Sequence, residues 1–164
     1  MVPEGVALPA LDRFAAGRVP HAGQTLRRGR LELAVVGWVA QDAFDRRLWA
    51  CDFNVVRGED SFVRAQWAAR PFAWHLYPQE GGAHRLKLEA FLARYAEGLA
   101  DDAAAALGAF SRALNGTEGP ALAAAWPALS GALPTLELHA QRWAARLAQL
   151  PDLAAQLVAC ASGR

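Results

Sequence analysis

The sequence contains little cysteine. Cys51 and Cys160 are its only two cysteines in 164 residues, they lie far apart, and no histidine stands near either one in the spacing of a zinc site. Disulfide-rich domains and structural zinc sites both need several cysteines at short, paired spacings. We therefore expect neither, and this scarcity is typical of a protein in a reducing cytosol.

Lysine is nearly absent as well. Lys87 is the only lysine among 17 basic side chains, and alanine is abundant. This bias is typical of bacterial genomes rich in G and C, so we expect a bacterial protein. Because arginine keeps its charge and offers planar pairs of donors, an anion site in this chain should be built from arginine.

The chain also lacks a long apolar run and a strong net charge. No stretch reaches about 18 uninterrupted apolar residues, and the N-terminus has neither the charged nor the apolar region of a signal peptide. These absences predict a cytoplasmic protein without a membrane span. The 17 basic and 16 acidic side chains leave a formal net charge of +1, so nucleic acid would have to bind at a local basic patch.

The sequence does have enough apolar residues to fold. Hydrophobic residues make up 54% and charged residues 20%, a balance that disordered chains do not have. The length predicts a single domain, 1–164. Within it, prolines and glycines predict an N-terminal arm over 1–25, alternating residues predict a sheet over 31–77, and helical spacing predicts a helical region over 84–162.

Four runs of alternating residues predict four strands, over 31–40, 46–57, 61–69 and 72–77. The connections between them are short, and short connections join antiparallel neighbours. The expected fold class is therefore α+β, a four-stranded antiparallel β-meander at about 31–77 followed by a C-terminal helical half of four to five helices. One face of this sheet is apolar, and the other carries Glu32, Asp52, Asn54, Arg64, Gln66, His75 and Tyr77.

An apolar seam in the helical half suggests an interface. From Pro134 onward its residues alternate spacings of three and four, and two arginines flank a tryptophan at its centre. A large ring rimmed by guanidinium groups is typical of an interface anchor. We therefore expect a non-catalytic interaction protein, which binds a protein partner or forms a homo-oligomer through Leu136, Arg142, Trp143, Arg146 and Leu147. Packing of the seam within the chain is the competing interpretation.

Arginines interleaved with aromatic residues support a second hypothesis. These residue types form the stacking platforms and backbone clamps of proteins that bind single-stranded nucleic acid. The predicted strands place the tryptophans on the apolar face, however, which favours the core for them. The candidate nucleic-acid-binding residues are Arg27, Arg28, Arg30, Arg46, Arg47 and Arg64.

A third hypothesis is an enzyme whose site lies on the polar sheet face. Asp52 and His75 would be its acid/base pair, but neither lies in a catalytic motif, and a solvated face is polar in any case. The four histidines are scattered, and no glycine-rich loop has a phosphate-binding pattern. The sequence therefore favours a protein that is not an enzyme and has no cofactor and no metal.

Overall fold

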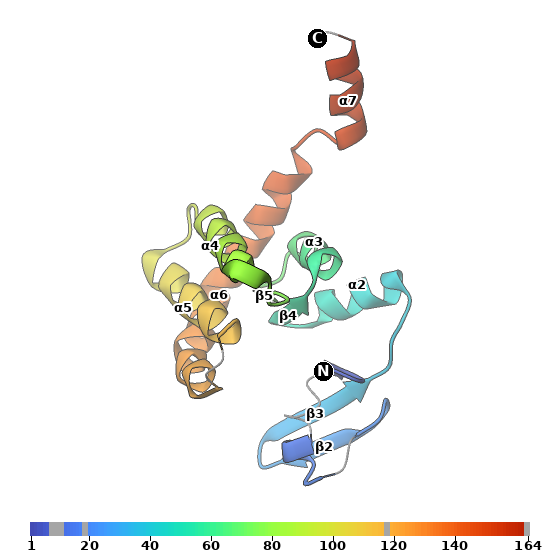
Figure 1. Ribbon diagram of the computed structural model, residues 1–164, viewed down its shortest axis with the longest axis vertical. Helices are drawn as coiled ribbons and strands as arrows, with labels where there is room; N and C mark the ends of the chain where they lie inside the picture. Colours follow the sequence, from blue (N-terminus) through green and yellow to red (C-terminus); the bar gives the residue numbers. More distant parts are fainter. Residues whose placement is uncertain (7–11, 18–19, 117–118, 163–164) are drawn as a thin grey trace. The chain divides into compact units, whose positions relative to one another are not determined.

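The computed structural model describes residues 1–6, 12–17, 20–116 and 119–162 (Figure 1). The chain forms two compact units, Met1–Phe44 and Asp45–Arg164. The single domain over 1–164 stays a prediction. No helix in the described ranges combines the length and the hydropathy that crossing a bilayer requires.

The first unit is a small three-stranded sheet with the strand order β1-β3-β2. Strand β1 (Val2–Pro3) runs parallel to β3 (Leu31–Val36), and β2 (Thr25–Arg28) pairs antiparallel with β3. Gly29, at φ +59°, lies in the turn between β2 and β3. The only strand that the meander prediction shares with this sheet is therefore the one that begins at Leu31.

A parallel β-α-β motif begins the second unit. Helix α2 (Gln41–Ala50) leads into β4 (Asn54–Arg57), helix α3 (Glu59–Trp67) and β5 (Phe72–His75). Strands β4 and β5 pair in parallel, with the register running from Asn54 beside Phe72 to Arg57 beside His75. The carboxyl ends of both strands thus meet at one edge of this sheet.

The predicted four-stranded antiparallel meander is wrong. The sheets are small and mixed, and 41–50 and 59–67 are helices. The run 61–69 alternates in sequence, but the side chains that α3 turns inward follow a helical spacing of three: Phe62 is half-buried, and Ala65 and Ala68 are buried. Val63 and Trp67, which the alternation assigned to the core, are about half exposed.

Strand β4 has the opposite faces from those that alternation predicted. Asn54 and Val56 are buried, whereas Val55 is 52% exposed. Asn54 is accommodated in the interior because its side-chain amide donates to the Leu48 carbonyl at 3.0 Å. This hydrogen bond to α2 satisfies the polar side chain on the inward face of β4.

The helical C-terminal half is confirmed, and with it the mixed α+β class. A 3₁₀ turn (Glu80–Gly82) precedes α4 (Ala83–Tyr95), α5 (Asp101–Leu114), α6 (Gly119–Ala148) and α7 (Leu153–Ala161). Helix α6 contains Pro127 and Pro134, positions at which the sequence suggests interruptions.

An aromatic cluster fills the core between the β-α-β motif and the helices. Its rings come from α3, β5 and α4, with centroids 3.9–6.2 Å apart. The best buried of them is Tyr95, at 1% exposure. Contacts of this kind stabilise beyond their buried area and fix β5 against α4. The members of the cluster are Phe62, Phe72, Trp74, Phe91 and Tyr95.

Candidate functional site

A sharp corner joins the end of β4 to the start of α3. Gly58 makes this corner at φ +81° and ψ 170°, a conformation that is essentially restricted to glycine. The first turn of α3 follows at once, so its free backbone N–H groups and the positive end of its dipole lie at the carboxyl edge of β4 and β5. In open parallel sheets, ligands bind at this edge, and helix N-termini there hold anions.

An arginine and a tyrosine flank the corner. The Arg57 guanidinium carbon lies 4.4 Å from the centroid of the Tyr77 ring, within cation–π distance. Tyr77 follows β5 and is 55% exposed, and a Cβ placed on Gly58 would lie 3.4 Å from its ring. Tyr77 thus orients a permanent positive charge next to the N-terminus of α3 without burying it.

The Gly58 carbonyl is held by two donors. The Trp74 indole N–H donates to it at 3.2 Å, and so does the backbone N–H of Phe62. The Trp74 and Phe62 rings stack with centroids 3.9 Å apart. The glycine peptide is therefore fixed from β5 and from the first turn of α3 together, which gives the corner a defined geometry.

Two acidic residues follow Arg57 and Gly58 in the sequence. Glu59 and Asp60 begin α3, where carboxylates favour the helix dipole. Arg64 donates to Asp60 at 3.2 Å and to both oxygens of Asp45 at 2.9 and 3.0 Å, and the Asp45 bonds contribute most to raising the pKa of Arg64 above its ordinary value. Among the described residues, no ion pair engages Glu59.

His75 lies at the same edge as Arg57 but is partly buried. Burial, and secondly the charge of Arg57, lower the pKa of His75 below its ordinary value of 6.5. The ring is therefore neutral near pH 7. The corner thus combines a fixed cation, a helix N-terminus, a neutral imidazole and two carboxylates.

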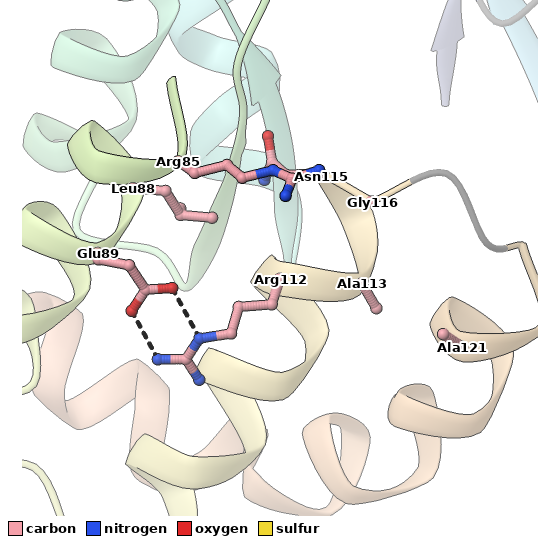
Figure 2. Close-up of a pocket in the computed structure, with 8 residues that line it drawn as sticks. All are labelled: Arg85, Leu88, Glu89, Arg112, Ala113, Asn115, Gly116 and Ala121. Atoms are coloured by element: carbon pink, nitrogen blue, oxygen red, sulfur yellow. Dashed lines mark hydrogen bonds and ion pairs between the residues drawn. The ribbon is translucent and has the colours of Figure 1, made fainter. Parts of the chain in front are cut away.

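A separate hollow of about 430 Å³ lies between α4 and the end of α5 (Figure 2). Two of its charged groups engage each other, because Arg112 donates through Nε and Nη2 to the two oxygens of Glu89, both at 2.8 Å. The polar atoms of Asn115 bond to backbone groups. No group of three or more metal-ligating side chains occurs in the described part of the chain. The corner is therefore the better candidate for chemistry.

The structure separates the predicted acid/base pair. Asp52 precedes the start of β4, whereas His75 ends β5, and the two strands are parallel. The two residues consequently lie toward opposite ends of the two-stranded sheet and do not form a pair. The polar sheet face that was expected to carry them does not exist, since Arg64 and Gln66 lie on α3.

The arginines of the nucleic-acid hypothesis are spread over both units. Arg27 pairs with Glu32 at 2.6 Å, and the Arg28 guanidinium lies 5.6 Å from the Phe14 ring centroid. Arg30 lies in the turn between β2 and β3. The other candidates are on helices, Arg46 and Arg47 on α2 and Arg64 on α3.

Much of the predicted interface seam packs inside its own unit. Trp143 is 8% exposed, its ring centroid lies 5.1 Å from that of Tyr95, and its indole donates to Gln66 at 3.1 Å. Leu136 is 1% exposed, and Leu147 is half-buried. On the exposed side of α6, Arg146 pairs with Glu97, and Arg142 is exposed. Partner binding by this set stays a prediction.

Sequence reasoning missed the corner itself. It assigned Gly58, Glu59 and Asp60 to a turn between antiparallel strands, and it counted Arg57 only among the arginines interleaved with aromatic residues. The available signal was a glycine between a β-branched run and two acidic residues, because acidic residues favour the first turn of a helix. That pattern describes a strand, a tight corner and a helix N-terminus.

Comparison with known proteins assigns this chain to a family. The sequence profile of the family described as Elongation-Factor P (EF-P) rhamnosyltransferase EarP matches residues 1–162. The chain belongs to the EarP family. It is 49% identical over 158 residues to the protein-arginine rhamnosyltransferase of Pseudomonas putida and 48% identical over 158 residues to that of Pseudomonas aeruginosa, in each case over 96% of this chain.

A solved structure supports the same assignment. It comes from work on the structural basis for EarP-mediated arginine glycosylation of translation elongation factor EF-P, and it matches with a TM-score of 0.83 and 47% identity. The match covers 96% of this chain and 49% of that chain. The chain likewise spans 41% and 42% of the two Pseudomonas relatives, so it corresponds to less than half of those EarP-family proteins.

Family membership overturns the leading functional hypothesis. A non-catalytic interaction protein was expected, but the relatives are glycosyltransferases. The preference against an enzyme was therefore wrong. The nucleic-acid hypothesis is wrong as well, because the family and these relatives are named for arginine rhamnosylation. The error arose because the corner residues follow no common catalytic motif.

Proposed function

We propose that this chain is the part of a protein-arginine rhamnosyltransferase that binds the activated sugar. The observation that carries the proposal is the Arg57-Gly58-Glu59 corner at the carboxyl edge of two parallel strands. The family supplies the class of reaction, and the corner supplies a place for a donor with a negatively charged leaving group.

The donor chemistry follows from the bond that has to break. Transfer of rhamnose needs a leaving group that departs with the electron pair of the anomeric C–O bond, and a phosphate-bearing group is well suited to this. Arg57 offers a permanent charge held by Tyr77, and the first turn of α3 offers backbone donors. Both stabilise the negative charge that grows on the departing oxygen.

The acceptor chemistry suits the carboxylates of the corner. The relatives are named as enzymes that transfer rhamnose to an arginine of a protein. The guanidinium of arginine is a cation that carboxylates bind in a planar, paired geometry. In the step we propose, the anomeric C–O bond breaks, a C–N bond to the arginine forms, and the nitrogen loses a proton. Glu59 is our candidate to bind the incoming guanidinium and accept that proton.

The test is calorimetric binding of rhamnosyl nucleoside diphosphates, carrying each common base in turn, to the 164-residue chain. Replacing Arg57 with Gln should weaken binding by about tenfold to a hundredfold, the value of a hydrogen bond to a charged group. Arg142→Gln is the matched control, because Arg142 is also exposed but lies on α6. Equal binding by Arg57→Gln and the unchanged chain would refute the proposal.

A further inference from the structure

Asn115, directly after α5, makes three side-chain hydrogen bonds to backbone groups. Its Oδ1 accepts from the Leu76 N–H at 2.8 Å, and its Nδ2 donates to the carbonyls of Trp74 and Ser111, each at 2.8 Å. Only the Ser111 bond lies within the α5 segment. The other two reach about 40 residues back along the chain, to the end of β5.

These two bonds lie on the edge of β5 that faces away from β4. Backbone groups of alternate residues in a strand point to opposite edges. The backbone N–H of Asn54 on β4 donates to the Pro71 carbonyl at 2.9 Å. Residues 71, 73 and 75 therefore face β4, whereas Trp74 and Leu76 face the other edge. There the Asn115 amide pairs with one strand N–H and one strand carbonyl, as a neighbouring strand would.

The segment held in this way carries both supports of the corner. Trp74, whose carbonyl Asn115 binds, donates its indole N–H to Gly58, and Tyr77 follows directly after Leu76 and orients Arg57. We propose that Asn115 is a positioning residue for the donor site. Asn115 does not contact the sugar donor. It fixes the position of β5 so that Trp74 can donate to the Gly58 carbonyl and Tyr77 can hold Arg57.

A role limited to ending α5 predicts a different pattern of effects. The bond to Ser111 suffices to cap the helix, and it needs no contact with β5. The amide of Asn115, seen at the end of α5 in Figure 2, has its hydrogen-bonding groups aimed at two elements at once. Helix capping alone predicts a loss of stability, whereas positioning also predicts a loss of donor affinity, so measuring both separates the two roles.

The proposal rests on the proposed function, so the experiment reads the two separately. Asn115→Asp keeps the shape and the acceptor for Leu76 but loses both donors, so a carboxylate oxygen faces the Trp74 carbonyl. We expect donor affinity to fall about tenfold, the ratio that corresponds to one hydrogen bond of ordinary net strength. Asn115→Ala should weaken binding at least as much.

Leu129→Ala is the control for a general loss of stability. Leu129 is fully buried on α6, and its truncation destabilises the core while leaving the Asn115 hydrogen bonds in place. Donor affinity should stay within about twofold of the unchanged chain in this variant, measured at a temperature where all variants are folded. If Leu129→Ala weakens binding as much as Asn115→Asp, or if Asn115→Asp leaves affinity unchanged, positioning by Asn115 is wrong.

Nuclear magnetic resonance gives a readout that does not need the donor. In Asn115→Asp, the Leu76 amide should stay protected from exchange, while the signals of the Trp74 indole, the Tyr77 ring and the Gly58 amide should shift. Unchanged signals at these three places would overturn the inference even if the chain binds no sugar donor. Absence of donor binding to the unchanged chain would instead refute the proposed function alone.

Discussion

Replacement of Gly58 with alanine should damage the corner more than the stability of the fold. At φ +81° and ψ 170°, Gly58 occupies a region that an L-residue enters only at a cost of about 1–3 kcal/mol. Alanine also restricts the unfolded chain, which offsets about 0.4–1 kcal/mol of that cost. The net loss in the free energy of unfolding should therefore be about 1–2 kcal/mol.

The backbone of Gly58→Ala can reduce this strain by leaving the native dihedral angles. If the alanine relaxes toward negative φ, the carbonyl at position 58 rotates away from the Trp74 indole and the Phe62 N–H. The new Cβ, which would lie 3.4 Å from the Tyr77 ring, also presses on the residue that orients Arg57. Donor affinity should thus fall by about tenfold to a hundredfold, as for loss of a bond to a charged group.

Urea denaturation and calorimetric donor titration of the same samples test this reasoning. Gly81→Ala is the matched control, because Gly81 also has a positive φ, +66°, yet no atom lies within 4 Å of an added Cβ. It should lose comparable stability and keep its donor affinity. Equal loss of donor affinity in both variants, or unchanged donor affinity in Gly58→Ala, would refute the role given to Gly58.

Three further variants test separate parts of the structure. Trp74→Phe should keep most of the ring stacking but lose the indole hydrogen bond to the Gly58 carbonyl. The loss should lower the free energy of unfolding by about 1 kcal/mol and weaken donor binding. Full donor affinity in this variant would contradict the role given to the indole. Burial lowers the pKa of His139 below its ordinary 6.5, so the unfolded chain binds a proton at this histidine more readily than the folded chain does. The free energy of unfolding should therefore be greatest above pH 6.5 and fall as the pH drops through that value toward the lower folded pKa. His139→Gln should reduce this fall, measured by urea titrations at about pH 8 and about pH 5. Gly108→Ala places a Cβ 2.9 Å from Nη1 at the end of the long Arg112 side chain, which can move away. Because alanine favours a helix over glycine, thermal unfolding should show a gain in stability of up to about 1 kcal/mol. A loss of more than about 1 kcal/mol would show that the arginine is fixed.

The sequence predicted those parts of the fold whose periodicity is long and continuous. The helical half followed from stripes that extend over several turns, and the hairpin strand at Leu31 followed from alternation. It failed between 41 and 69, where short apolar runs satisfy two periods at once. In α3, Val63, Ala65 and Trp67 alternate like a strand, whereas Ala65 and Ala68 are the buried positions of a helix.

The wrong topology had a direct effect on the predicted site. An antiparallel meander joins neighbouring strands by hairpins, so the residues after β4 became a turn and no helix N-terminus was expected there. A parallel β-α-β connection instead gathers the carboxyl ends of both strands at one edge. The sequence analysis placed His75 and Tyr77 on one polar face but did not place Arg57 beside them, because the two segments meet only in the parallel arrangement.

The corner and its supports differ in how far a sequence can reveal them. Arg57, Gly58 and Glu59 are adjacent, and a strand followed by a glycine and an acidic helix start is a readable local pattern. Trp74, by contrast, lies 16 residues from Gly58, to which it donates. Asn115 lies 39 residues from Leu76, whose N–H it accepts. Nothing local distinguishes Asn115-Gly116 from any other end of a helix. Its two bonds to β5 depend on where α5 stops relative to that strand, so removal of the Asn115 amide tests a relation that only the folded chain contains.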